Sequence, residues 1–146
     1  MKSLTLVVLL LSVLVTPAVA QQTETIGHVR ELSGTASIER GTASLPASVG
    51  LALQRGDQIR TDKPGAVGLV LLDDTTISLG SNSALSLNDF DFLPKERKFS
   101  LAMRMIKGTF VYVSGQISKL APDAIQLSIP DATIAVRGTK LLVEIE

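Results

Sequence analysis

Residues 66–79 read AVGLVLLDDTTISL, and this stretch decides the fold class. An apolar run over 66–72 is followed by two aspartates and then by 76–79, where apolar and polar residues alternate. Successive side chains of a strand point to opposite faces of a sheet, and Asp is a frequent turn residue. The stretch therefore predicts two strands joined by a tight turn.

The same pattern continues along the chain. Gly, Pro, Asn or Asp separates further segments with strand patterning, which are 35–38, 84–87, 99–106, 110–113, 125–129, 133–136 and 140–145. Residues 95–107 also contain good helix formers, but Phe99, Leu101, Met103 and Met105 alternate with polar or small residues, which favours a strand. We expect one all-β domain of short strands, either β-solenoid-like or a twisted β-sandwich.

Composition excludes several function classes. The 146 residues include 14 Lys and Arg, 14 Asp and Glu, one histidine and no cysteine. Disulfides, thiol nucleophiles and thiolate metal sites are therefore absent, and the lone His28 disfavours a metal centre. The balanced charge is not that of a nucleic-acid-binding protein, and no phosphate loop, serine elbow or acid–base pair is found. We expect no enzymatic activity, no cofactor and no nucleic-acid partner.

The first twenty residues are typical of an export signal. Lys2 precedes an apolar run over 4–15, Pro17 ends it, and the small residues Ala18 and Ala20 form a cleavage site. The run is shorter than the roughly 20 residues that span a bilayer, which disfavours an uncleaved anchor. We predict a signal peptide over 1–20, a tail over 21–26, a domain over 27–146, and a periplasmic or extracellular location.

Residues 56–61, Gly-Asp-Gln-Ile-Arg-Thr, form the most specific local motif. Gly56 permits a turn with positive φ, and the Asp57 carboxylate can accept hydrogen bonds from the turn amides. Residues 74–79 and 131–136 share the pattern Asp-x-Thr-Ile-x-apolar, in which each Asp is expected to close a turn before a strand.

Four motifs occur in order, and together they resemble the FecR-domain family of exported bacterial proteins. They are Gly27-His28-Val29 with Gly34-Thr35-Ala36, the 56–61 turn, the Asp74 strand start, and Val136-Arg137-Gly138-Thr139. The resemblance runs from about Gly27 to Val143. These motifs, with Lys107-Gly108-Thr109-Phe110 between the last two, make Gly56, Asp57, Thr61, Asp74, Gly108, Gly138 and Thr139 expected structural residues.

The resemblance implies a β-rich sensing or interaction module of the cell envelope. In the signalling branch of the family, such a domain lies behind a membrane helix and an inner anti-sigma segment, and it relays the occupancy of an outer-membrane receptor. This chain has a predicted signal peptide in place of the cytoplasmic segment. We therefore expect the stand-alone exported form.

Arg137 is the first candidate site residue. Beside Gly138, its guanidinium offers a planar donor fork to a carboxylate or sugar acid of a partner. The alternative that we favour is structural: an internal ion pair, with Asp57 or Asp131, or a backbone-carbonyl clamp that fixes a β-corner.

The chain's five aromatic residues all lie between positions 90 and 112. We expect Phe99, Phe110 and Tyr112 to pack in the core on adjacent strands. The alternative is a surface that stacks on glycans or an apolar patch that binds a protein partner. In Asp89-Phe90-Asp91-Phe92, acidic and aromatic residues alternate, which predicts an exposed docking loop. The basic residues 95–98 that follow are interpreted as a solvated turn.

The leading functional hypothesis is a non-catalytic envelope module that binds a protein partner in signal transduction or surface assembly. Its tentative partner-binding residues are Arg137, Asp89, Phe90, Asp91 and Phe92. The alternative is a module that binds peptidoglycan or another polysaccharide, with Phe90, Phe92 or Tyr112 contacting the glycan.

Overall fold

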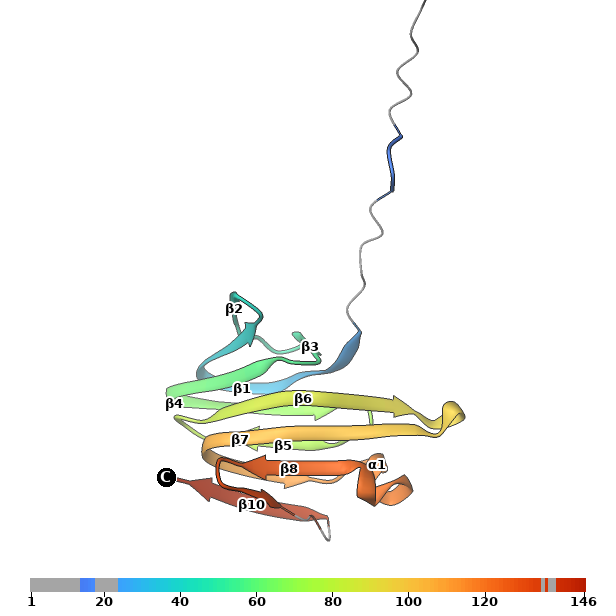
Figure 1. Ribbon diagram of the computed structural model, residues 1–146. Helices are drawn as coiled ribbons and strands as arrows, with labels where there is room; N and C mark the ends of the chain where they lie inside the picture. The colour runs from blue at the N-terminus through green and yellow to red at the C-terminus, as the bar shows by residue number, and fades with distance from the viewer. Residues whose placement is uncertain (1–13, 18–23, 135, 137–138) are drawn as a thin grey trace, which may run out of the picture.

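A computed structural model describes residues 14–17, 24–134, 136 and 139–146, and it confirms the predicted all-β fold (Figure 1). The strands and short helices are β1 (Thr25–Arg40), β2 (Ala43–Pro46), β3 (Ala52–Gln54), β4 (Gln58–Leu71), β5 (Thr76–Leu79), β6 (Ala84–Leu93), η1 (Pro94–Glu96), β7 (Lys98–Val113), α1 (Gln116–Leu120), η2 (Pro122–Ala124), β8 (Ile125–Ile129), β9 (Ala132–Ile134) and β10 (Lys140–Ile145). The predicted strands 76–79, 125–129 and 140–145 match β5, β8 and β10 in full. Residues 99–106 lie within β7, so the strand interpretation of this segment is confirmed.

The ten described strands form one hydrogen-bonded sheet that folds back on itself. The first part of β4 pairs with β6 and its last part pairs with β5. In the same way, β7 pairs with β6 along its first part and with β5 along its last four residues. The long strands therefore pass from one layer of a sandwich to the other (Figure 1). Of the described pairings, β7–β8 alone is parallel, and this antiparallel arrangement favours the sandwich over the solenoid.

β1, β4 and β7 are longer than predicted, because glycines that were interpreted as turns lie inside them. β6 also extends beyond the predicted end at residue 87. β1 and β7 each have 16 residues, and β4 has 14. Gly34 has φ 67° and pairs with Gly65 across β1 and β4, while Gly108 has φ 100° within β7. A Cβ atom at Gly108 would overlap the Ser83 side chain. These glycines bend continuous strands between the layers, where the sequence predicted separate short strands.

One apolar core fills the sandwich. Its largest fully buried side chains include Phe110 and Tyr112, and Phe90 is 2% exposed. The core location predicted for Phe110 and Tyr112 is confirmed. Phe99, which is half-buried, lies on the same strand, β7, so the predicted placement on adjacent strands was wrong.

The 56–61 turn forms as predicted. Gly56 has φ 89°, and the buried Asp57 carboxylate accepts a hydrogen bond of 2.8 Å from the Gln54 backbone N–H. Arg40 donates two hydrogen bonds to this carboxylate, at 2.9 and 2.8 Å. Arg40 of β1 is thus the cation that pairs with Asp57, and Arg137, together with Gly138, lies outside the described residues.

Asp73, and not Asp74 as predicted, closes the turn between β4 and β5. The buried Asp73 carboxylate accepts hydrogen bonds from the Thr75 N–H (3.1 Å), the Thr75 hydroxyl (2.8 Å) and the Ile117 N–H (3.2 Å). Asp74 is exposed in the left-handed region at φ 68°. Because the Ile117 N–H belongs to the first turn of α1, Asp73 also holds that helix against the sheet.

The two predicted structural threonines have different roles. The buried Thr61 hydroxyl donates to the Gly80 carbonyl and accepts from the Ser83 N–H at 2.9 Å, so it stabilises the connection between β5 and β6. Thr139 is exposed, and its carbonyl accepts a hydrogen bond of 2.9 Å from the Ser114 N–H.

Candidate functional site

The β6–β7 hairpin carries the candidate site at its closed end. β6 and β7 lie side by side, η1 joins them, and α1 lies at the same end of the molecule (Figure 1). Pro94 begins η1 at a position where its missing N–H costs nothing, and Arg97 ends it in the left-handed region at φ 51°. The hairpin continues directly into long paired strands, so this end is rigidly positioned.

A register shift in β6 determines which side chains the hairpin buries. The pairing with β7 shifts between Leu87 and Asp89, so one extra residue interrupts the alternation. Leu85 and Leu87 point into the core before the shift, and Phe90 points inward after it. Asp89, Phe90, Asp91 and Phe92 therefore belong to a strand, and the prediction of an exposed docking loop was wrong.

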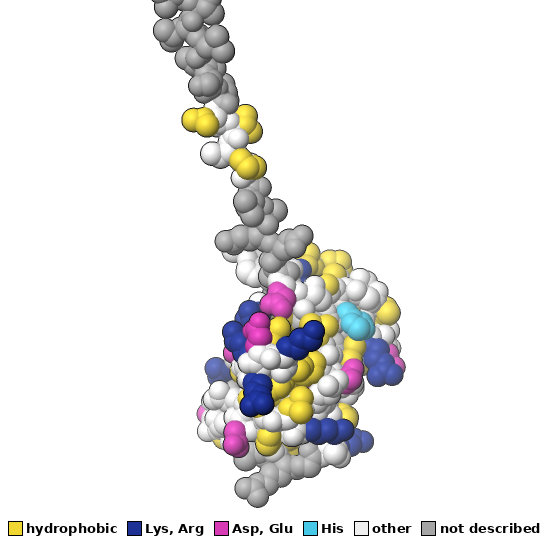
Figure 2. All heavy atoms as spheres, turned by 90° about the vertical axis from the view of Figure 1, so that its right-hand side faces the viewer, with side chains coloured by type: hydrophobic (Ala, Val, Ile, Leu, Met, Phe, Trp, Pro, Cys, Tyr) yellow, Lys and Arg dark blue, Asp and Glu magenta, His cyan; other side chains and the backbone are white. Residues whose placement is uncertain are grey.

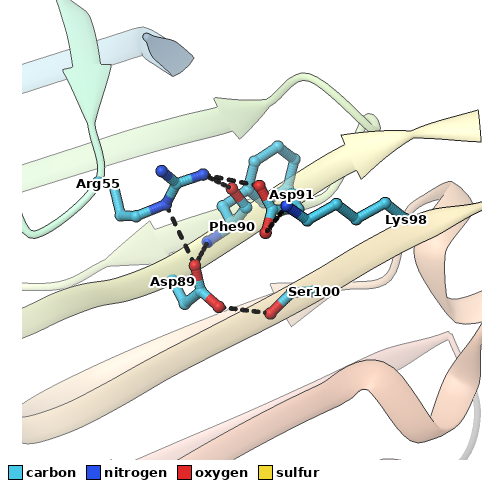
Figure 3. Close-up of polar contacts among 6 residues, drawn as sticks. All are labelled: Arg55, Asp89, Phe90, Asp91, Lys98 and Ser100. Carbon is cyan, nitrogen blue, oxygen red and sulfur yellow. Dashed lines mark hydrogen bonds and ion pairs between the residues drawn. The ribbon is translucent and has the colours of Figure 1, made fainter. Parts of the chain in front are cut away.

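Asp89 and Asp91 are engaged in an internal network with Arg55 (Figure 3). Arg55, from the turn between β3 and β4, contacts Asp89 at 3.1 Å and Asp91 at 2.8 Å. It also donates a 2.6 Å hydrogen bond to the Phe90 carbonyl. From the neighbouring strand β7, the Ser100 hydroxyl donates a hydrogen bond of 2.7 Å to the Asp89 carboxylate. The Lys98 Nζ atom, also from β7, lies 4.0 Å from the Asp91 carboxylate. This network connects the β3–β4 turn to the hairpin.

The hairpin end leaves apolar surface uncovered beside this network. The half-buried rings of Phe92 and Phe99 contact each other, with centroids 6.1 Å apart. A hollow of about 380 Å³ is lined by Phe92, Leu93, Pro94, Lys95 and Glu96. A second hollow of about 480 Å³ is lined by Pro94, Arg97, Phe99, Leu120 and Ala121. Leu93 is 37% exposed and Leu120 is 56% exposed.

Cationic side chains surround this apolar surface. Figure 2 shows apolar side chains at this end of the molecule with Lys and Arg side chains, and also Asp and Glu side chains, around them. The exposed cations of the segments concerned are Lys95, Arg97, Lys98 and Lys119. Lys98 approaches Asp91, whereas Lys95, Arg97 and Lys119 form no ion pair with any other described residue. We call this surface, made by Phe92–Phe99 and Lys119–Ala121, the hairpin-end surface.

The structure brings together only part of the predicted site. Phe92 lines a hollow, Asp89 and Asp91 bind Arg55, and Phe90 is in the core. Arg137 lies outside the described residues. Tyr112 is fully buried, so it has no surface for a glycan.

Sequence reasoning missed Pro94 and Leu120, which belong to this surface, and Arg55, which lies beside it. The available signal was the juxtaposition of Phe92-Leu93-Pro94 with the basic residues 95–98, which was interpreted as a solvated turn. Leu120 had no local signal, because its proximity to the hairpin arises from the tertiary fold.

The polar groups of the described residues include no arrangement for metal binding. No three or more His, Asp or Glu side chains gather there in a way that could hold a metal ion.

Burial, helped by the negative charge of Asp73, raises the pKa of Tyr112 to about 12. The Tyr112 hydroxyl has no hydrogen-bond partner among the described residues. Its location inside the core separates it from the hairpin-end surface.

The family comparison confirms the resemblance found in the motifs. The model of the FecR protein family matches residues 57–146, from the Gly-Asp turn to the end of β10, and the chain therefore belongs to the FecR family. This family is associated with envelope signal-transduction regulators. No curated protein and no solved structure matches the chain. Over the described residues, every helix is too short or too polar to cross a membrane.

Proposed function

We propose that this FecR-family chain is an exported, non-catalytic sensing or interaction module that binds a protein partner through the hairpin-end surface. The observation that carries the proposal is the exposed apolar surface with cations around it that other described side chains do not neutralise. Exposed apolar patches with a polar border are typical of protein–protein interaction sites. Export through residues 1–20 places the module in the periplasm or outside the cell.

The fold supports this role because it presents the surface on a rigid base. β6 and β7 are paired over nearly their whole shared length, and the Arg55 network attaches the hairpin to the β3–β4 turn. A preorganised surface loses little conformational entropy on binding, which favours affinity. In this proposal Phe92 contacts the partner, while Asp89 and Asp91 position the hairpin through Arg55.

Photo-crosslinking in the cell that produces the chain tests the proposal. A photoreactive amino acid replaces Leu93 in one variant and Leu142 in another, since Leu142 is also exposed but lies on β10. We expect one envelope protein to crosslink reproducibly from position 93 and not from position 142. Equal crosslinking from both positions, or none from position 93, would overturn the proposed surface.

Cosedimentation with purified peptidoglycan tests the alternative function. The half-buried Phe92–Phe99 ring pair is the feature of the described surface that could stack on a sugar. Retention of the wild-type chain by peptidoglycan, lost in Phe92→Ala and kept in Leu142→Ala, would favour the polysaccharide-binding module over the protein-binding module.

A further inference from the structure

We propose that the segment bound at the hairpin-end surface is an acidic peptide of the partner that carries two bulky apolar side chains. This inference rests on the proposed function and adds the chemistry of the partner. It is carried by the shape of the surface and by its charge, which are independent observations.

The shape of the hairpin-end surface favours a peptide with two apolar side chains as anchors. The two hollows share Pro94, so they adjoin each other. Both hollows, of about 380 and about 480 Å³, are open to solvent. Phe92 and Leu93 supply the apolar wall of the first hollow, and Phe99 and Leu120 supply that of the second. One large aliphatic or aromatic side chain in each hollow would remove this apolar surface from water.

The positive charge of the hairpin-end surface favours carboxylates next to those apolar side chains of the peptide. Lys95 lines the first hollow, Arg97 lines the second, and Lys119 precedes Leu120. These three cations have no ion-pair partner among the described residues. Glu96, which also lines the first hollow, is the acidic residue of the same segments, so the four cations, Lys98 included, outnumber it. Opposite charges across an interface accelerate association and exclude partners of the wrong charge.

Concavity favours a peptide over a lipid surface. A membrane contacts a convex apolar tip, whereas two adjoining hollows fit discrete side chains. Vesicles of anionic phospholipid therefore serve as the competing probe.

Selection from a phage-displayed random peptide library tests the proposal directly. The purified chain is the target, together with two charge variants that alter net charge equally. Lys95→Glu with Arg97→Glu changes the proposed surface, and Lys63→Glu with Lys107→Glu changes exposed cations of β4 and β7 away from the hairpin end. Leu93→Ser with Leu120→Ser removes apolar surface from positions that are already exposed. Far-ultraviolet circular dichroism verifies that each variant is folded.

We expect the wild type to enrich peptides rich in Asp and Glu that carry two large apolar residues. For an enriched peptide, we expect Lys95→Glu with Arg97→Glu to raise the dissociation constant at least about tenfold, and the β4/β7 control variant to raise it less than about twofold. Leu93→Ser with Leu120→Ser should also weaken binding about tenfold.

Several results would overturn the inference: no enrichment, enrichment without a preference for acidic residues, or equal losses in the two charge variants. Binding to anionic vesicles without binding to peptides would replace it with a membrane contact. If position 93 crosslinks to an envelope protein but the library shows no acidic preference, the inference fails and the proposed function stands. If neither experiment detects a protein or peptide, the inference and the proposed function both fail.

Discussion

At the scale of single residues, Tyr112 provides an internal probe of the core. It is the only tyrosine, and the chain has no tryptophan, so tyrosinate absorbance reports on this side chain alone. Burial and, secondarily, the charge of Asp73 raise its pKa to about 12. We expect the absorbance midpoint of the folded chain to lie near that pH. The chain in denaturant should titrate near the ordinary value of about 10.

The raised pKa of Tyr112 also predicts a loss of stability at high pH. Below about pH 10 the hydroxyl is neutral in both states and has no pH-dependent effect. As the pH rises from about 10 to 12 the unfolded chain ionises first, so the free energy of unfolding falls by about 2–3 kcal/mol. Tyr112→Phe should lose this part of the pH dependence and, since it removes an unpaired buried hydroxyl, should not be destabilised at pH 7. Denaturant unfolding at several pH values measures both effects, and an unchanged slope in Tyr112→Phe would contradict the assignment.

Arg40 and Arg60 allow a matched comparison of a buried ion pair with an exposed one. Arg40 contacts Asp57, whose side chain is 1% exposed, whereas Arg60 contacts Glu39 with both side chains more than 40% exposed. Arg40→Met should destabilise the fold by about 2–4 kcal/mol, because it leaves a buried carboxylate without its cation. Arg60→Met should change stability by less than about 1 kcal/mol. Chemical denaturation measures the free energy of unfolding of both variants. Equal losses would show that the burial of Asp57 does not determine the size of the loss.

At the scale of elements, Asp73 connects the β4–β5 turn to α1. Asp73→Asn removes charge-assisted hydrogen bonds to Thr75 and to the Ile117 N–H, and should cost about 1–3 kcal/mol. Asp74→Asn is the control, because Asn also adopts the left-handed conformation and the side chain is exposed. Asp73→Asn should additionally lower the pKa of Tyr112, since a negative charge is removed. Thermal unfolding and tyrosinate titration measure the two effects, and indistinguishable variants would argue against this role.

Also at the scale of elements, Gly108 allows a test of whether glycines form tightly packed bends in the long strands. In Gly108→Ala, the added Cβ atom would lie 2.5 Å from the Ser83 Cα atom, which is too close for an ordinary contact. The alanine would also have to adopt a positive φ. Gly41→Ala also occurs at positive φ, but a Cβ there meets nothing within 4 Å. We expect about 1–2 kcal/mol of destabilisation for Gly41→Ala and about 1–3 kcal/mol more for Gly108→Ala. Equal unfolding midpoints would contradict a packed bend at Gly108.

At the scale of the whole molecule, export predicts a defined mature chain. If residues 1–20 are removed, the protein recovered from the envelope or medium begins at Gln21. Intact-mass spectrometry of the recovered protein tests this prediction. Ala20→Arg replaces the small residue of the cleavage site and should leave the precursor unprocessed. Recovery of the wild type with residues 1–20 still attached would refute the signal peptide.

Much of the molecule was predictable because its signals are local. Alternation with period 2 identified the all-β class and the bounds of β5, β8 and β10, since side chains two residues apart share one face of a strand. The Gly56-Asp57 turn was predictable for the same reason, because its hydrogen bond joins residues three positions apart. The ordered motifs also indicated the FecR family.

The candidate site was predictable only in part. Phe92 was singled out and lies on the hairpin-end surface, but the register shift after Leu87 sends Phe90 inward. A change of one residue reverses the faces of a strand. Such a shift depends on pairing with β7, so the residues of β6 alone do not reveal it.

By itself the sequence determined the all-β class, the bounds of β5, β8 and β10, the Gly-Asp turn and the family. Tertiary structure decided which glycines bend a continuous strand, which aspartate of the 73–74 pair is buried, and which apolar side chains meet beside the hairpin. These outcomes depend on contacts between residues far apart in the chain, such as Gly108 with Ser83, Asp73 with Ile117, and Pro94 with Leu120 across one hollow. Local periodicity describes the faces of a strand, but only packing determines what each face meets.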